Sequence, residues 1–220
     1  MEYVGEFRFG KKWNGKGYDE NGNIIYELTN GNGKVKEYSE FNGEFIFEGE
    51  YINGKRNGKG KEYGKYYDKL KFEGEYLNGE RFGYGKEYSL IGKIEFEGEY
   101  LNDERNGKGK EYNKDGELIF EGEYLNGVKN GQGKEYYYDG NLIFEGEYLN
   151  GKKWEGKGYN GSNNIVYELK EGNGLVKQHY SGNLKFEGEY LNGKVFIGNK
   201  YKKESNKEYQ YNQDNNMKAK

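Results

Sequence analysis

One five-residue segment, FEGEY, recurs along this chain and constrains its fold more than any other feature. Full copies begin at Phe47, Phe72, Phe96, Phe120, Phe144 and Phe186, and those from Phe47 to Phe144 are 24 or 25 residues apart. Divergent copies begin at Tyr3, Tyr26 and Tyr167, which gives nine repeats in all. A fixed period of this length indicates a repeat architecture, in which each repeat packs mainly against its neighbours.

The repeat has the pattern of a β-hairpin. In its first half, large residues and glycine alternate with glutamate, which places Phe47, Gly49 and Tyr51 on one face and the glutamates on the other. Its second half, residues 58–63, alternates glycine with lysine in the same way. The linking segment INGKRN is rich in Asn and Gly, which supply the positive φ angles of hairpin turns. The chain is therefore expected to form an antiparallel sheet of consecutive hairpins.

Two kinds of turn predict the same partition of residues between the faces. One is a two-residue turn between repeats, as at Asp139-Gly140, and the other is a six-residue loop within a repeat. In the register of this loop Glu48 faces Lys61. Two residues further along, Glu50 faces Lys59. One face is thus predicted to carry a ladder of Glu–Lys pairs, each contributing about 0.2–1 kcal/mol, and the other to carry rings that cover glycine backbone.

Composition favours a thin core of rings over both a thick apolar core and a disordered chain. The hydrophobic fraction of 32% and the mean hydropathy of -1.27 are typical of disorder. Aromatic residues nevertheless make up 18% of the chain, with 25 Tyr, 38 Gly and no Pro. Such a chain is suited to short strands joined by tight turns.

We therefore expect an all-β fold, an elongated, twisted, single-layer antiparallel sheet of tandem β-hairpins. The array is assigned to residues 1–201, in about nine hairpin repeats that start near residues 3, 26, 47, 72, 96, 120, 144, 167 and 186. The repeats at Tyr26 and Tyr167 lack the first turn, so the sheet is expected to bend or narrow at residues 26–38 and 167–180. Residues 202–220 are polar and aperiodic and are predicted to form a flexible tail.

Residues 120–133, FEGEYLNGVKNGQG, resemble the MORN (membrane occupation and recognition nexus) repeat. The shared features are aromatic-x-Gly-x-aromatic, an Asn-Gly turn and Gly-x-Gly, and the resemblance extends from residue 3 to about residue 201. The chain departs from the family at positions where Trp is frequent, because it has Tyr51, Tyr76, Tyr100, Tyr124, Tyr148 and Tyr190 there. The resemblance implies single-layer hairpins whose grooved aromatic face binds other proteins, and a role in attachment to lipid or membrane.

The sequence predicts no enzyme, no cofactor and no metal site. Cysteine is absent, His179 is the only histidine, and no serine has the context of a nucleophile elbow. The carboxylate pair Glu48 and Glu50 recurs in every full repeat, whereas a catalytic site is normally singular. With a net charge of -3 and interleaved acids and bases, the chain also lacks the basic patch of a nucleic-acid-binding protein.

The leading functional prediction is a scaffold that binds protein partners through its aromatic face. The residues assigned to that face are Phe47, Tyr51, Phe72, Tyr76, Phe96, Tyr100, Phe120, Tyr124, Phe144 and Tyr148. An open sheet edge at the first strand, near Tyr3, would also allow a homodimer.

The alternative prediction is a membrane-surface adaptor that contacts anionic lipid with basic hairpin tips. These tip residues are Lys11, Lys12, Lys55, Arg56, Lys152 and Lys153. Glu80 and Asp103 occupy equivalent positions in other repeats, which argues against it. A module that binds cell-wall carbohydrate is a third possibility and would require secretion, for which the first residues show no signal. We expect a cytoplasmic protein, attached to the membrane surface under the alternative.

Overall fold

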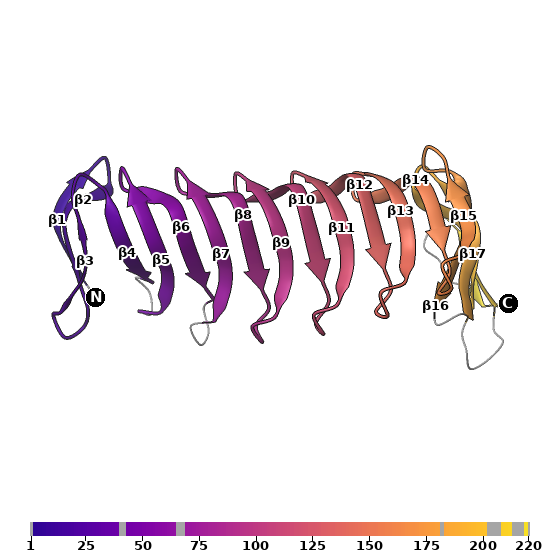
Figure 1. Cartoon of the computed structure of the whole chain (residues 1–220), viewed down its shortest axis with the longest axis horizontal. Helices are drawn as coiled ribbons and strands as arrows, with labels where there is room; N and C mark the ends of the chain where they lie inside the picture. Colours follow the sequence, from indigo (N-terminus) through magenta and orange to yellow (C-terminus); the bar gives the residue numbers. More distant parts are fainter. Residues whose placement is uncertain are drawn as a thin grey trace. The chain divides into compact units, whose positions relative to one another are not determined.

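The computed structural model of the protein describes residues 2–39, 43–64, 69–180, 183–201, 208–212 and 218–219, and every named element in them is a β-strand (Figure 1). The strands are β1 (Glu2–Arg8), β2 (Lys11–Tyr18), β3 (Ile24–Leu28), β4 (Gly33–Tyr38), β5 (Phe45–Ile52), β6 (Lys55–Tyr63), β7 (Leu70–Leu77), β8 (Glu80–Tyr88), β9 (Ile94–Leu101), β10 (Glu104–Tyr112), β11 (Leu118–Leu125), β12 (Val128–Tyr136), β13 (Leu142–Leu149), β14 (Lys152–Tyr159), β15 (Ile165–Leu169), β16 (Gly174–Tyr180), β17 (Asn183–Leu191), β18 (Lys194–Tyr201), β19 (Glu208–Asn212) and β20 (Lys218–Ala219). Strands β4 to β15 are hydrogen-bonded in chain order as a 12-stranded antiparallel sheet, and β1–β3 and β16–β20 form sheets of three and five strands. The predicted all-β fold of tandem antiparallel hairpins is confirmed.

The chain divides into two compact units. The first comprises residues 1–107 and 114–116, and the second comprises residues 108–113 and 117–220. Each contains one of the shortened repeats, and in each the sheet is interrupted there, between β3 and β4 or between β15 and β16. Only an isolated bridge, Thr29 with Asn32 or Lys170 with Asn173, is formed at each interruption. The bend or narrowing expected at residues 26–38 and 167–180 thus takes the form of a break in the hydrogen-bond ladder.

The turns between repeats have the predicted register. Across Asp139-Gly140, Lys134 lies opposite Glu145 and Gly133 lies opposite Gly146. The predicted two-residue turn itself is wrong, because the register shifts between Glu135 and Tyr136 and Gly140 alone of the two turn residues has a positive φ, of 80°.

The predicted six-residue loop within a repeat is wrong. Asn53-Gly54 alone forms the turn, with φ angles of 53° and 71°, and Tyr51 lies opposite Arg56. A β-bulge absorbs the extra residues, and its left-handed position is Gly58, with φ of 73°. Glu50 consequently does not have the predicted lysine directly opposite it. Residues 53–58 contain two Asn-Gly pairs, and the first makes the turn while the second makes the bulge.

Rings lying on paired glycines form the core of each compact unit. In the first unit Phe47 is 0% exposed and lies over Gly49 and its cross-strand partner Gly60. A Cβ atom on either glycine would lie 2.6 Å from a ring carbon of Phe47. Tyr76, from the next repeat, meets the same ring edge-on at 5.3 Å between centroids. Glycine is required at both strand positions because only bare backbone leaves room for the ring.

Each of these tyrosines joins two successive hairpins. Tyr76 also meets Phe72 of its own repeat, at 5.8 Å and 87°. In the second compact unit Tyr148 meets Phe120 at 5.2 Å and Phe144 at 5.5 Å, again edge-on. Edge-to-face pairs contribute about 0.5–1.5 kcal/mol beyond the area that they bury. The stability of a repeat therefore depends on its neighbours.

The C-terminal segment differs from the flexible tail predicted for residues 202–220. Of these, residues 208–212 and 218–219 are described and form β19 and β20, and the remainder lies outside the described residues. Strand β19 is antiparallel to β18, with Glu208 opposite Tyr201. An additional strand satisfies the backbone groups at the edge of β18, which explains the pairing. The alternating sequence EYQYN was the signal for this strand.

Replacing Gly60 with alanine is expected to destabilise the protein by about 1–3 kcal/mol, because the methyl group would displace the buried ring of Phe47. The midpoint of urea-induced unfolding measures the effect. Gly64→Ala is the matched control, since its added Cβ would come no closer than 3.8 Å to any described residue apart from its chain neighbours, and its effect should stay within about 0.5 kcal/mol. Equal shifts for the two variants would contradict the ring-on-glycine account of the core.

Candidate functional site

The rings assigned to the partner-binding face lie inside the two compact units. The five phenylalanines, Phe47, Phe72, Phe96, Phe120 and Phe144, are 0% exposed, and Tyr76, Tyr100, Tyr124 and Tyr148 are 3–4% exposed. Only Tyr51 is half-buried. A ring without exposed surface offers nothing for a partner to contact in this conformation, so we reassign these residues to the core. The sequence predicted that rings cover glycine backbone, but it did not show that this contact leaves the phenylalanine rings without exposed surface.

A positively charged side chain covers the outer face of each phenylalanine. The pairs, with the distance from the charged group to the ring centroid, are Arg56 on Phe47 (4.1 Å), Arg81 on Phe72 (4.0 Å) and Arg105 on Phe96 (4.0 Å) in the first unit, and Lys129 on Phe120 (3.9 Å) and Lys153 on Phe144 (5.1 Å) in the second. Contacts of this kind contribute about 0.5–2 kcal/mol, depending on burial. Arg56 occupies this place because the turn is shorter than predicted, which moves its side chain from the tip to the strand position opposite Tyr51.

Glutamates link these cations within each unit. Arg56 donates to Glu37 at 2.8 Å, and Arg81 donates to Glu62 at 2.6 Å. The Tyr76 hydroxyl also donates to Glu62, at 2.9 Å. Burial alone would raise the pKa of Glu62, but the hydrogen bonds from Arg81 and Tyr76 and the charges of both arginines lower this pKa below its ordinary value. In the second unit the corresponding ion pairs are Lys129 with Glu111 at 2.9 Å and Lys153 with Glu135 at 2.5 Å.

The six basic residues assigned to hairpin tips occupy different environments, and Lys55 alone among them is exposed. Arg56 and Lys153 belong to the set that covers rings, while Lys11 and Lys152 pack their aliphatic stems near Gly54 and Gly193. Lys12 donates to the Tyr26 hydroxyl at 3.0 Å. These side chains therefore do not form one free basic edge.

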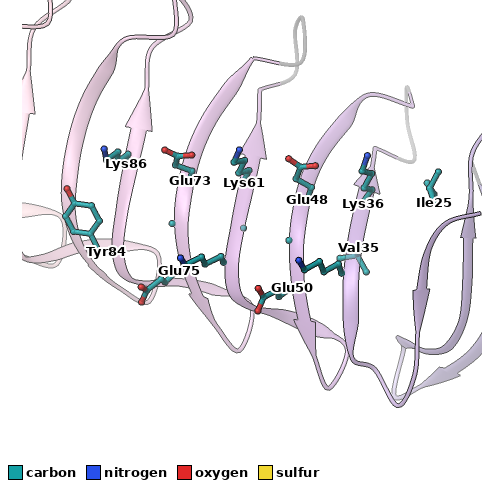
Figure 2. Close-up of a pocket in the computed structure, with 15 residues that line it drawn as sticks. Ile25, Val35, Lys36, Glu48, Glu50, Lys61, Glu73, Glu75, Tyr84 and Lys86 are labelled. Carbon is teal, nitrogen blue, oxygen red and sulfur yellow. The ribbon is translucent and has the colours of Figure 1, made fainter.

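The opposite face of the first compact unit contains a groove of about 670 Å³ (Figure 2). It runs across β4 to β8, and Ile25 of β3 lines one end. Two rows of side chains form its walls: Lys36, Glu48, Lys61, Glu73 and Lys86 in one row, and Lys34, Glu50, Lys59, Glu75 and Tyr84 in the other. Between the rows lie Gly49, Gly60 and Gly74, so the floor is backbone. Figure 2 shows the alternation of charge along the first row.

Two of the four groove carboxylates accept hydrogen bonds from tyrosine hydroxyls. The Tyr63 hydroxyl donates to Glu48 at 2.8 Å, and the Tyr88 hydroxyl donates to Glu73 at 2.5 Å. The other two carboxylates lie against bulge glycines, Glu50 against Gly58 and Glu75 against Gly83, where a Cβ atom would collide with them. In the second unit Glu123, at the same repeat position, accepts a hydrogen bond from a backbone N–H at 2.9 Å.

Four lysines of the groove have no ion-pair partner within the described part of the chain. Lys34, Lys36, Lys59 and Lys61 are exposed, and none lies within 4.0 Å of a carboxylate oxygen of a described residue. Lys86 differs, because it pairs with Glu97 at 3.6 Å. The groove therefore interleaves exposed ammonium groups with carboxylates, of which Glu50 and Glu75 likewise have no ion-pair partner within 4.0 Å among the described residues.

One repeat departs from its neighbours inside the groove. Tyr84 stands where the adjacent repeats have Lys59 and Lys108. Its ring is 49% exposed, and its hydroxyl donates to Glu97 at 3.0 Å. We did not single out Tyr84 from the sequence, although a position-by-position comparison of the repeats would have revealed it.

His179 lies in a smaller hollow of about 200 Å³ in the second compact unit. It is half-buried, and the Tyr137 hydroxyl donates to its backbone carbonyl at 2.6 Å. The described residues that line this hollow include Glu135 and Lys153, which already form an ion pair, and no serine, threonine or cysteine.

Consecutive antiparallel hairpins with a ring-on-glycine core define a β-hairpin repeat protein. Residues 47–66, 72–89, 96–117 and 120–142 match the MORN repeat. The chain therefore contains four MORN repeats within residues 47–142. The further repeats that the sequence predicts on either side stay predictions.

Other comparisons add little. No curated protein matches the chain. Among solved structures, a chain in the crystal structure of TcdB2-TccC3 aligns with 91% of this chain and 13% of its own length, at 10% identity and a TM-score of 0.25. This likeness is too weak to support a statement about the fold or the function of the chain. The described residues include no helix long and apolar enough to cross a bilayer.

The free energy of unfolding is expected to decrease as the pH falls below about 4.5, the ordinary pKa of a glutamate. The pKa of Glu62 is lowered in the folded chain, so its stabilisation is complete above that value and is lost as the carboxylate is protonated. Glu62→Gln should lower stability at pH 7 by about 1.5–3 kcal/mol and should flatten the pH dependence of the urea midpoint. The control Glu95→Gln, at an exposed position, should follow the wild-type curve. An unchanged curve for Glu62→Gln would refute the role of the carboxylate.

Proposed function

We propose that this chain is a non-catalytic repeat scaffold that binds a protein partner along the groove of its first compact unit. MORN-repeat proteins are generally repeat scaffolds involved in protein or membrane interaction. The observation that carries the proposal is the contrast between the two faces. The aromatic row is buried under arginine and lysine side chains, whereas the groove is open and carries exposed lysines.

The size of the groove suits a segment of polypeptide. It crosses five strands, and at about 4.8 Å between strands its length is about 20 Å. Side chains are fixed in rows by the register, so a partner meets a surface that is already ordered. A preformed surface lowers the conformational cost of binding.

The groove is tested by affinity capture with three immobilised forms of the purified chain. The forms are wild type, the groove variant Lys36→Ala/Lys61→Ala/Tyr84→Ala, and the control Lys114→Ala/Tyr138→Ala, whose side chains are exposed outside the groove. Proteins retained from an extract of the cells that contain the chain are quantified by mass spectrometry. Proteins enriched by wild type and control are expected to be lost, by at least about tenfold, from the groove variant.

Each form is first examined by circular dichroism and sedimentation velocity. The second measurement is needed because β1 is hydrogen-bonded to β2 alone in its sheet, so its free edge could pair with a second copy. Identical retention by the groove variant and the wild type, with both folded and in the same oligomeric state, would refute the proposed site.

Attachment to a membrane surface is the second candidate function, and the first hairpin turn favours it. Phe9 is 96% exposed and has a φ of 50°, at the turn position where other repeats have asparagine. A bulky residue in this conformation costs about 1–3 kcal/mol. Arg8 beside it is exposed, and Lys11 follows. An exposed ring with basic neighbours suits an interface that contains anionic lipid.

Phe9→Asn introduces the turn residue of other repeats. Because this variant should be more stable than the wild type, weaker membrane binding by it cannot be attributed to unfolding. The substitution should raise the unfolding free energy by about 1 kcal/mol and reduce co-sedimentation with vesicles that contain phosphatidylserine. The groove variant should co-sediment like wild type. Undiminished vesicle binding by Phe9→Asn, or no vesicle binding by the wild type, removes this candidate.

A further inference from the structure

We propose that strand β1 is a homodimerisation site, which pairs antiparallel with β1 of a second copy of the chain so that Gly5 lies opposite Gly5. The pairing joins two three-stranded sheets into one continuous sheet with a two-fold axis at its centre. No residue of β1 lines the groove, so this inference is independent of the proposed function.

Strand β1 presents a regular edge for pairing. Among the described strands it is hydrogen-bonded to β2 alone. The bulge between the two strands places its extra residue, Trp13, on β2, so β1 itself runs without interruption from Glu2 to Arg8. The backbone N–H and C=O groups of such an edge pair readily with another strand unless lysine, proline or a bulge blocks it. Strand β1 contains none of these three.

Phe7 has the place of a buried ring but is exposed. It occupies the second aromatic position of its repeat, the position that Tyr76 holds in a later repeat of the same compact unit. Tyr76 is 3% exposed, because it packs edge-on against Phe47 of the preceding repeat at 5.3 Å between centroids. Phe7 is 57% exposed and meets Tyr3 of its own strand, at 5.2 Å. A further ring is needed to bury Phe7, and a second copy of the chain supplies one.

The register with Gly5 opposite Gly5 brings this ring into place. Tyr3 of each copy then lies opposite Phe7 of the other, so four rings gather on one face around the two-fold axis. Aromatic pairs at opposite positions of antiparallel strands stabilise their pairing. The register also continues the glycine pairing within the chain, where Gly5 already lies opposite Gly15.

The neighbouring symmetric registers are less favourable. A pairing centred on Val4 places Tyr3 opposite Gly5, so no ring lies opposite another ring. A pairing centred on Glu6 places two Glu6 side chains directly opposite each other, and like charges at such positions are destabilising. In the proposed register Glu6 faces Val4, whose side chain is 55% exposed in the single chain.

The interface is small, because each chain contributes a strand of seven residues. Interfaces that bury less than about 1,200 Å² are typical of weak or transient association. The dimer is therefore expected to exchange with the monomer at about micromolar concentrations.

Sedimentation velocity of the full-length chain tests the association. The wild type should change from a monomer of 25.6 kDa to a species of twice this mass as its concentration rises to about 100 µM. Val4→Lys/Phe7→Lys should raise the dissociation constant at least about tenfold, because it removes the ring contact and places lysine on the edge strand. The control Leu90→Lys/Phe82→Lys exchanges exposed residues of the same kinds outside β1 and should associate like the wild type. Circular dichroism establishes that each variant is folded.

Disulfide cross-linking tests the register, and the chain has no cysteine of its own to interfere. Val4→Cys and Glu6→Cys are mixed in equal amounts and oxidised with glutathione disulfide. In the proposed register the two thiols of a mixed dimer lie at opposite positions, with Cα atoms about 4.5–5.5 Å apart, which a disulfide spans. In a dimer of either variant with itself the Cα atoms are about 8 Å apart, which is too far. Mass spectrometry should find the mixed product in at least about tenfold excess over either symmetric product.

Several results would overturn the inference. A wild type that stays monomeric at about 100 µM, or unchanged association of Val4→Lys/Phe7→Lys, would exclude pairing through β1. A predominant symmetric product of Val4→Cys or of Glu6→Cys would contradict the register centred on Gly5. Masses that rise beyond twice that of the monomer would indicate head-to-tail association and would contradict the two-fold pairing. Each of these outcomes leaves the groove proposal unchanged.

Discussion

The contact of a phenylalanine ring with a pair of cross-strand glycines is the constraint on which the rest of this structure depends. A single sheet has no second layer to bury its apolar residues, so the rings must be buried within the layer itself. Gly49 and Gly60 make this possible because neither carries a Cβ atom that would keep the ring of Phe47 away from the backbone. Tyr76 closes one side of the ring from the next repeat.

The outer side of each ring determines the electrostatics of the aromatic face. An arginine or lysine lies on it, and that cation needs an anion nearby because it is half-buried. Glu62 meets this need for Arg56 and Arg81 together, and so couples adjacent hairpins. Ring, cation and carboxylate thus form one interdependent set that is repeated along each compact unit. A face built in this way is a core with a charged covering.

The same glycines leave the other face with a floor of backbone. Side chains of the intervening residues stand on either side of that floor and form the two walls of the groove. The bulge at each repeat also acts on this face, because a carboxylate such as Glu50 lies against its glycine. Carboxylates and ammonium groups alternate along both walls. One structural device therefore buries the aromatic face and shapes the groove on the other.

The sequence by itself determined the period of the array, the hairpins, their two-faced character and the register at turns such as Asp139-Gly140. These follow from alternation and turn chemistry, which are local properties. It could not determine the turn within a repeat, because either Asn-Gly pair of residues 53–58 satisfies the local rules. Choosing the first pair places Arg56 on Phe47, and only the packed sheet decides this. Burial of the rings, the hydrogen bonds from Tyr63 and Tyr88 to groove carboxylates and the exposure of Tyr84 arise from contacts between neighbouring strands, so tertiary structure alone decided them.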